Sequence, residues 1–537
     1  MKRKEFIQYS LALIAFSSIA SSCRRQQKIA GQIAGANAKV GHQLRDKKFP
    51  SPSRIMKKEI VIIGGGVAGL SAARKLHKEG KQDFVLLDLE QKTGGNAAYG
   101  KNEISAFPFG AHYIPIPNNN LVAYHEFLQE CEVIKSFDEK GMPVYNEYHL
   151  CFDPEERLYI NGRWQEGLIP HFGLPENDLR EIEKFLSLMI TFRYQKGADG
   201  KDAFAIPVDD SSDDEQFKML DRLSMKEWLL KNEMKSEYLH WYVNYCTRDD
   251  FGTPYEMCSA WAGIHYFASR KGKGANAEHG DVLTWPEGNG FLTDRLSRDY
   301  RQQIVTGALA IAVRQMAGEV EVEYFDTATE EVVLITAKHC IMAVPQFVAA
   351  RLLNDLPRKE LVNRHYQYAP WMVANLVVSN IEERTGVATS WDNVIYNSRS
   401  LGYVDATHQD IQQQKLKKNL TYYLPLTDGN VKEARMKAQK TTHEQWVEQV
   451  MSDLEPVHPN IREKTEEVNI MLWAHAMVQP TPGIIFGDTR KKLAASVGNI
   501  HFAHTDIAGV SIFEEGFYQG IKAANKILTT VKKDADA

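Results

Sequence analysis

Short apolar runs on either side of a helical pattern mark the first recognisable unit of the chain. Residues 59–63 read Glu-Ile-Val-Ile-Ile, and such a β-branched run is typical of a strand buried on both faces of a parallel sheet. Apolar residues then recur at helical spacing through residues 68–77, including Leu70 and Leu76, and a second apolar run occupies residues 84–87. The pattern predicts a strand, a helix and a second strand in succession.

Patterns of the same kind later in the chain predict the rest of the framework. Alternating or continuous apolar runs predict strands, and apolar positions at helical spacing predict helices. The expected strands are residues 320–324, 332–335, 340–344 and 499–503, and the expected helices are residues 220–245, 291–296 and 514–524.

The first 56 residues have a different character. Basic residues at positions 2–4, a modest apolar run at 11–20 and small residues before Cys23 predict a processed export signal over residues 1–23. The apolar run is too short to span a bilayer about 30 Å thick, so we expect no permanent transmembrane anchor. Residues 24–56 are polar, Gly/Ala-rich and basic, which predicts a flexible linker.

The signal resembles two kinds of bacterial export signal. Residues 3–7 resemble a twin-arginine signal in which one Arg is replaced by Lys, and the small residues before Cys23 resemble a lipoprotein cleavage box. The resemblance implies an exported protein, either periplasmic or anchored to the membrane through a lipid on Cys23. Twin-arginine export carries folded proteins, which would suit a protein that binds its cofactor first. A disordered basic arm is the alternative interpretation.

Composition narrows the function classes. The chain has 537 residues, of which 43 % are hydrophobic and 25 % charged, as expected for a soluble globular protein of two or three folded units. A net charge of −5 gives no basic surface for nucleic acid, so a small-molecule partner is expected. The six cysteines show no metal-ligand spacing, which predicts buried thiols and no metal site.

A glycine-rich turn joins the first expected strand to the helix. The pattern Gly64-x-Gly66-x-x-Gly69 fits the G-x-G-x-x-G of dinucleotide-binding proteins. Gly64 permits the tight turn, Gly66 leaves room for a pyrophosphate, and Gly69 lets the helix and the strand pack closely. The helix then begins at Val67 and Ala68, where free N–H groups and the positive end of the helix dipole attract phosphates.

Asp88 ends the second expected strand about 20 residues after the turn, where a ribose-binding carboxylate belongs. It would accept hydrogen bonds from ribose hydroxyls and repel a 2′-phosphate, which argues against NADP. Strand, turn, helix and acid together predict a dinucleotide site, and a purely structural glycine turn would not explain all four. The chain has no second turn of comparable quality, which argues against a separate NAD(P)H site.

A glycine doublet, Gly94-Gly95, follows Asp88 and carries a resemblance to a known family. The whole unit resembles the FAD-binding start of the superfamily of flavin amine oxidases, phytoene desaturases and protoporphyrinogen oxidases. In that family the doublet contacts the FAD phosphates and is followed by Arg, where this chain has Asn96. The resemblance implies FAD as the cofactor, with the doublet and Asn96 among its contacts.

Further segments extend the resemblance. Residues 107–112, with Gly110, Ala111 and His112, look like the family segment that passes close to the isoalloxazine ring. Residues 340–345 are similar to the family strand that ends in an Ala-Val-Pro turn. Asp506 takes the place of the acid that lies by the ribityl chain or phosphate in that family.

The resemblance also implies a fold and a division of the chain. We expect an α/β protein with a Rossmann-like FAD-binding domain, built on a doubly wound parallel sheet, and an interleaved α+β substrate domain. The expected parts are an export signal (1–23), a basic flexible linker (24–56), FAD-binding segments (57–115, 286–350 and 471–530) and substrate-domain segments (116–285 and 351–470).

The residues that would decide the substrate fit an amine oxidase less well. In amine oxidases a Lys follows the Ala-Val-Pro turn by some thirty residues, but residues 368–375 contain none, and Ile512 falls near the place of an aromatic cage residue. The sequence therefore does not support an amine substrate. Candidate proton donors or acceptors are His475 and His112, since an imidazole titrates near neutral pH, although packed and hydrogen-bonded histidines are the alternative.

The segment at residues 245–249 holds further polar candidates. Tyr245, Arg248 and Asp249 would either orient a polar substrate or form a buried ion pair.

The sequence as a whole predicts an exported FAD-dependent oxidoreductase that oxidises a small organic substrate by hydride transfer to flavin N5. Oxygen or an electron carrier would then reoxidise the flavin. A desaturase or isomerase of a lipophilic substrate is the alternative within the same class, and a non-catalytic flavoprotein is the alternative outside it.

Overall fold

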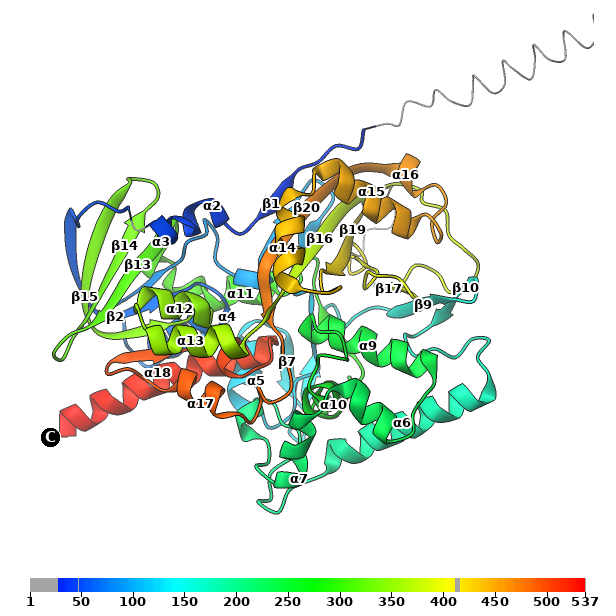
Figure 1. Ribbon diagram of the computed structural model, residues 1–537, viewed down its shortest axis with the longest axis horizontal. Helices are drawn as coiled ribbons and strands as arrows, with labels where there is room; N and C mark the ends of the chain where they lie inside the picture. The colour runs from blue at the N-terminus through cyan, green and yellow to red at the C-terminus, as the bar shows by residue number, and fades with distance from the viewer. Residues whose placement is uncertain (1–27, 47, 411–415, 537) are drawn as a thin grey trace, which may run out of the picture.

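The computed structural model describes residues 28–46, 48–410 and 416–536, and its two main sheets each organise one half of the molecule (Figure 1). The expected export signal and Cys23 lie outside the described residues. Within the described part of the chain, no helix combines the length and apolar character needed to cross a membrane.

The first sheet is the one that the opening pattern predicts. Its strand order is β12-β3-β2-β15-β14-β13, with β21 paired to the second half of β15, and β12, β3, β2, β15 and β21 run parallel. Residues 60–63 and 84–87 are buried, as the apolar runs require. The strands are β2 (Arg54–Ile63), β3 (Phe84–Leu87), β12 (Ile304–Val305), β13 (Ala308–Gln315), β14 (Val320–Asp326), β15 (Glu331–Met342) and β21 (Ile500–Phe502).

The second sheet has the order β1-β20-β16-β19-β18-β17-β9-β10 and is mostly antiparallel. Its strands come from both expected substrate-domain segments, so the prediction of an α/β fold with an interleaved second domain is confirmed. β20 continues beyond the boundary expected at residue 470. The strands are β1 (Ile33–Gly35), β9 (Glu156–Ile160), β10 (Arg163–Glu166), β16 (Tyr368–Val378), β17 (Asp392–Ile395), β18 (Tyr403–Asp405), β19 (Lys418–Pro425) and β20 (Thr465–Val478).

Two helices pack closely against each other beside the first sheet: α4 (Val67–Lys78) and α18 (Phe513–Asp536) (Figure 1). Four helices pack together in the other half: α6 (Glu176–Tyr194), α8 (Met225–Lys231), α9 (Glu237–Phe251) and α10 (Ala260–Ala268). The longer helices and short strands that remain are α5 (Val122–Glu130), α11 (Gly290–Leu296), α12 (Gln346–Leu352), α13 (Leu356–His365), α14 (Val431–Lys440), α15 (His443–Leu454), α17 (Asp488–Ala494), β4 (Tyr99–Lys101), β5 (Ala106–Pro108), β6 (Tyr113–Pro115), β7 (Ile134–Phe137), β8 (Pro143–Tyr145) and β11 (Val282–Thr284). The four-residue helices are α2 (Ala38–Gly41), α3 (Gln43–Asp46), α7 (Glu215–Lys218) and α16 (Ile461–Lys464).

The single helix expected over residues 220–245 is broken in the structure. Ser224 starts α8 with a reciprocal cap that includes Glu227, and Glu233, with φ 58°, ends it in the left-handed region. Ser236 then caps α9 by accepting a hydrogen bond from the Leu239 N–H. Local capping therefore divides the predicted helix in two.

The segment expected to be a flexible linker differs from that expectation where it is described. Strand β1 pairs in parallel with β20, and Ile29 is buried against the second sheet. The Asn37 N–H donates to Glu90 Oε1 over 2.7 Å, and Gly41 lies near Leu89. These backbone and side-chain contacts hold the segment against the two sheets. The segment is polar and basic and has no amphipathic pattern of its own, so its sequence did not predict this ordered structure.

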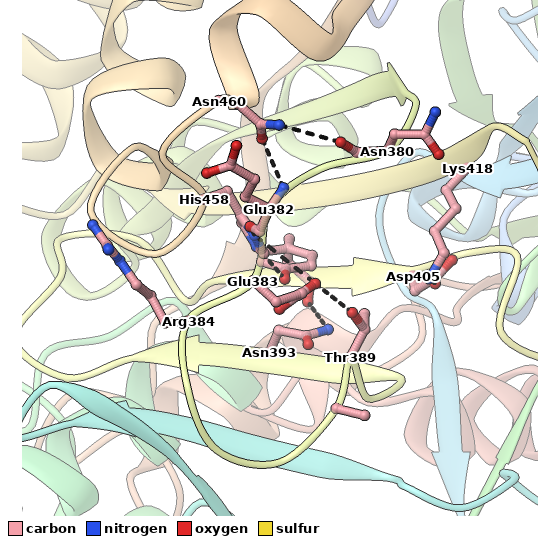
Figure 2. Close-up of polar contacts among 12 residues, drawn as sticks. Asn380, Glu382, Glu383, Arg384, Thr389, Asn393, Asp405, Lys418, His458 and Asn460 are labelled. Carbon is pink, nitrogen blue, oxygen red and sulfur yellow. Dashed lines mark hydrogen bonds and ion pairs between the residues drawn. The ribbon is translucent and has the colours of Figure 1, made fainter.

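A buried arginine ties together four segments of the second sheet. Arg157 in β9 forms an ion pair of 2.9 Å with Glu383 and donates to Asn393 Oδ1 over 2.5 Å and to the Tyr403 hydroxyl over 3.0 Å. The Tyr403 hydroxyl in turn lies 2.6 Å from His458 Nε2. Figure 2 shows Glu383, Asn393 and His458 converging from separate segments. Because the guanidinium is fully buried, each of these contacts replaces a lost hydrogen bond to water.

The substitution Arg157→Ala is expected to lower the free energy of unfolding by about 2–4 kcal/mol, because it removes a fully buried side chain together with the hydrogen bonds that it donates to Asn393 and Tyr403. Urea unfolding followed by circular dichroism measures this change. Arg180→Ala, which removes an exposed ion pair with Glu176, is the control and should cost less than about 1 kcal/mol. Equal effects of the two substitutions would contradict the assignment.

Candidate functional site

Two glycine-rich turns run side by side at the edge of the first sheet. The Gly94 N–H donates to the Gly65 carbonyl over 2.8 Å, and Gly66 forms a bridge with Gly94. Gly64 has φ +104°, a conformation that favours glycine. A Cβ on Gly66 would meet nothing closer than the Gly95 Cα at 4.0 Å, so open space lies above Gly66.

The same glycines set how closely α4 approaches its neighbours. A Cβ on Gly69 would lie 1.8 Å from the Gly64 carbonyl oxygen, so only glycine permits this helix to start beside the strand. Gly516 in α18 lies against Val67, where an added Cβ would be 3.3 Å from the valine side chain. Gly66, the residue before α4, provides no side-chain cap, so the first N–H groups of the helix stay available to an anion.

The two glycine-rich turns and the start of α4 form a hollow that we call the trough. Asp88, which directly follows β3, closes one end of it. Its Oδ2 accepts the Gly65 N–H over 2.5 Å and its Oδ1 accepts the Glu90 N–H over 2.7 Å. Burial raises the pKa of Asp88 to about 6. A Cβ on Gly65 would lie 2.3 Å from Asp88 Oδ2, so Gly65 is required as well, although sequence analysis treated it as a variable position.

The trough fits a dinucleotide. The open space between Gly66 and Gly95 would be filled by any side chain, and the uncapped start of α4 points N–H groups at the same place. A pyrophosphate needs such a gap, and a ribose beside it needs an acceptor such as Asp88.

Beyond the trough, β20 crosses the segment at residues 107–112. The Asn96 carbonyl accepts the Ala111 N–H over 3.0 Å, and the Asn96 side-chain amide donates to the Ala476 carbonyl. Trp473 Nε1 donates to the Phe109 carbonyl over 2.6 Å. A Cβ on Gly110 would lie 2.4 Å from the Asn96 carbonyl oxygen, so this loop packs without room for a side chain there.

The crossing borders a cavity of about 150 Å³, which we call the aromatic cavity. Its lining combines aromatic residues of the second sheet with residues 112 and 113 and the start of α18. It includes His112, Tyr113, Trp371, Tyr423, Trp473 and Phe513. Phe513 stands next to Ile512, the residue that falls near the place of the family's aromatic cage residue in the sequence.

The two histidines singled out from the sequence lie at different places. His112 lines the aromatic cavity, its ring stacked at 4.6 Å on Tyr423, and burial lowers its pKa to about 4. His475 does not line this cavity, and its ring lies 4.7 Å from Phe347 and 5.9 Å from Tyr368. Burial, together with Arg435, lowers the pKa of His475 to about 4. Both imidazoles are therefore neutral at pH 7, and a catalytic role for either stays a prediction.

An adjoining cavity of about 120 Å³, which we call the carboxylate cavity, shares His112, Tyr113 and Asp249 with the aromatic cavity. Glu156 and Asp392 complete a group of three half-buried carboxyl groups with Asp249. Within the described residues, no three His, Cys, Asp or Glu side chains are placed to hold a metal ion.

Burial makes these carboxylates difficult to ionise. It raises the pKa of Glu156 to about 7, and burial with the nearby Asp250 raises the pKa of Asp249 to about 7. Burial and the charges of Glu156 and Asp249 raise the pKa of Asp392. The one cation of the lining, Arg270, is already paired with Asp250 at 2.7 Å. A positively charged ligand would therefore be stabilised in this cavity.

The remaining candidates have local partners. Asp506 is buried, with Oδ2 accepting the Tyr368 hydroxyl over 2.6 Å and the Gln346 N–H over 2.8 Å, so its role toward a cofactor stays a prediction. Arg248 donates to the Arg399 carbonyl and forms no ion pair with Asp249. Glu156, Asp392 and Tyr423 were missed by sequence analysis, because no local motif marks them and only the fold brings them together.

Comparison with known proteins identifies the family. The model of the flavin containing amine oxidoreductases matches residues 67–528. Putrescine oxidase with putrescine bound has a similar structure, with a TM-score of 0.64 and 15 % sequence identity over 88 % of this chain and 100 % of that chain. A fatty acid isomerase from P. acnes that produces CLA gives a TM-score of 0.60 and 16 % identity over 87 % and 98 % of the two chains.

A short stretch also matches the flavin-containing monooxygenase FMO GS-OX4 of Arabidopsis thaliana, with 46 % identity over 50 residues. That match spans 9 % of this chain and 11 % of the relative.

The stability of the substrate-free protein should depend on pH through the carboxylate cavity. The pKa values of Glu156 and Asp249 are about 7 in the folded protein, whereas those of such groups in an unfolded chain are about 4. Between these two pH values the folded protein therefore binds more protons than the unfolded chain. The stability that this provides is complete below about pH 4 and is lost as the pH rises through about 7. Thermal unfolding of Asp249→Asn should therefore show a higher midpoint than the unsubstituted protein at pH 8, a smaller difference at pH 5 and little difference at pH 4.

Glu147→Gln, at an exposed position, is the matched control and should leave the pH dependence unchanged. An equal midpoint for Asp249→Asn and the unsubstituted protein at pH 8 would contradict a buried, destabilising charge at Asp249.

Proposed function

This chain belongs to the family of flavin-containing amine oxidoreductases and is an FAD-dependent oxidoreductase, and we propose that it oxidises a small, positively charged organic substrate by hydride transfer to flavin N5. The observation that carries the proposal is the carboxylate cavity. Glu156, Asp249 and Asp392 surround it, and its only cation is paired with Asp250. The carboxyl groups would hold an ammonium or a similar cation.

The cofactor residues that we propose follow the trough and the loop beyond it. Gly64, Gly66, Val67, Ala68 and Gly69 would place the pyrophosphate at the start of α4, and Asp88 would accept the ribose hydroxyls. The loop residues Gly94, Gly95, Asn96, Gly110, Ala111 and His112 lead from the pyrophosphate gap to the aromatic cavity, and Asp506 remains a further candidate. When FAD is bound there, it supplies a hydride acceptor for a C–N or C–C bond.

The chain's own residues would position the substrate. Tyr423 and Trp473 wall the aromatic cavity, where the reacting carbon would lie, while Asp249 stands where the two cavities meet. A bound cation favours the ionised form of Asp249 and so lowers its raised pKa. His112 stacks on Tyr423 as a neutral imidazole. The aromatic side chains would thus contact one end of a short substrate molecule, and the carboxylates would bind its other end.

Oxygen or an electron carrier is the proposed acceptor for reoxidation of the flavin.

An amine is the substrate class that fits this charge pattern, although residues 368–375 lack the lysine of amine oxidases. Putrescine, the ligand of the similar putrescine oxidase, carries two ammonium groups at neutral pH and suits a test. The aromatic walls favour the desaturase or isomerase alternative, but a lipophilic substrate would leave Glu156 without a hydrogen-bond partner and Asp249 and Asp392 with only long hydrogen bonds.

The substitutions Asp249→Asn and Glu156→Gln test the proposed substrate class. Putrescine should reduce the flavin absorbance of the unsubstituted protein under anaerobic conditions, and each substitution should raise KM at least about tenfold, as expected for the loss of one charge-assisted contact. Glu147→Gln should leave KM unchanged. Reduction by a fatty acid with none by putrescine would instead favour the lipophilic alternative, and reduction by neither would favour a non-catalytic flavoprotein.

We also propose that the chain is exported with FAD already bound, either to the periplasm or to a lipid anchor at Cys23. The basic residues, apolar run and small residues of positions 1–23 support this proposal.

Gly66→Val should yield a folded protein without flavin that accumulates before export. A Cβ at Gly66 meets open space, so the backbone tolerates the substitution while the side chain fills the pyrophosphate gap. Flavin absorbance of the purified protein and cell fractionation measure the two effects. Gly280→Val, at a position with open space in the carboxylate cavity and away from the glycine-rich turns, is the control for flavin binding alone and should keep its flavin. Normal export of flavin-free Gly66→Val would contradict the coupling, and retained flavin would contradict the site.

A further inference from the structure

A groove of about 700 Å³ opens between α12–α13 and α14, on the face where Figure 1 shows these helices. Five cationic side chains line it, and none forms an ion pair with a described residue. They are Arg351, Lys359, Arg364, Lys432 and Arg435. The only carboxylate that the described residues add to the lining, Asp355, caps α13 and lies 3.5 Å from Arg358 Nε. We call this hollow the basic groove.

The cations converge on the basic groove from three helices. Arg351 comes from α12, Lys359 and Arg364 from α13, and Lys432 and Arg435 from α14. The N-terminus of the ten-residue α14 lies in the lining and adds the positive end of its dipole. Burial lowers the pKa of Arg435, and no carboxylate opposes this shift. A cleft lined by one sign of charge concentrates counter-ions of the opposite sign.

The basic groove and the carboxylate cavity have opposite charges. Tyr368 and His475 line the groove, while Trp371 and Trp473 of the same two strands line the aromatic cavity. A cationic substrate that is drawn to Asp249 would be repelled by the groove. On the proposed function, which gives the substrate a positive charge, the groove therefore calls for a ligand different from the substrate.

We propose that the basic groove binds a small polyanion that carries two or more phosphate or carboxylate groups. The volume lies in the range of small-molecule sites, about 300–1,000 Å³. Cations on three sides match the separated negative groups of one such molecule. None of the proposed FAD residues lines this groove, and His475 in its lining would place the ligand beside the strand that borders the aromatic cavity.

Isothermal titration of the flavin-loaded protein with pyrophosphate, and separately with citrate, tests the proposal. We expect saturable binding of one molecule of at least one probe per chain, weakened by added salt. Pyrophosphate binding alone would assign the site to phosphates, and citrate binding alone to carboxylates. Because FAD occupies its own site in this preparation, binding does not report on the pyrophosphate gap at Gly66.

The double substitution Lys359→Ala/Arg364→Ala identifies the groove as the place of binding. Both side chains are exposed and lie outside the proposed catalytic and cofactor residues, so the protein should keep its fold and its flavin. Each lost cation should weaken binding about tenfold, or about 1.4 kcal/mol, and Lys140→Ala on an exposed loop should have no effect. No saturable binding of either probe, or equal binding by the double variant, would overturn the proposal.

Discussion

The path of β20 across the molecule is the constraint on which both halves depend. Over most of its length β20 pairs with β16, and at its far end it meets the loop at residues 96–112 through Trp473 and Asn96. The backbone N–H and carbonyl groups of β20 find their partners in β16 along most of the strand, so the position of β20 is fixed by the second sheet. The first sheet is thereby held against the second at the place where the aromatic cavity lies.

This strand also separates two opposite electrostatic environments. Between Ala369 and Trp371 the register shifts, so residues 474–476 stand opposite a single residue of β16. Such a bulge redirects side chains relative to regular alternation. Trp473 lines the aromatic cavity, whereas His475 lines the basic groove. Substrate and polyanion would therefore be kept apart by backbone geometry and by charge at the same time.

The parts of the fold that the sequence predicts are those that local periodicity and local sterics determine. Strand β3 matches the apolar run at residues 84–87, and Gly69 packs as the turn motif requires, because both depend on near neighbours in the chain. The carboxylate cavity could not be predicted, because Glu156, Asp249 and Asp392 come from three distant segments. The place of His475, in the lining of the basic groove and outside the aromatic cavity, could not be predicted for the same reason, since a bulge set by pairing with β16 has no local signal.

The carboxylate cavity opposes folding in the absence of a ligand. Within the described residues the Glu156 carboxylate has no hydrogen-bond partner, and the hydroxyls nearest Asp249 and Asp392, from Tyr113 and Tyr245, lie at 3.5 and 3.4 Å. Such distances give weak hydrogen bonds, so burial of these groups is poorly offset. A cation that enters the cavity replaces the missing partners and stabilises the folded state by its binding free energy. The cost of folding around these three carboxylates would thus be the source of the proposed preference for a positively charged substrate.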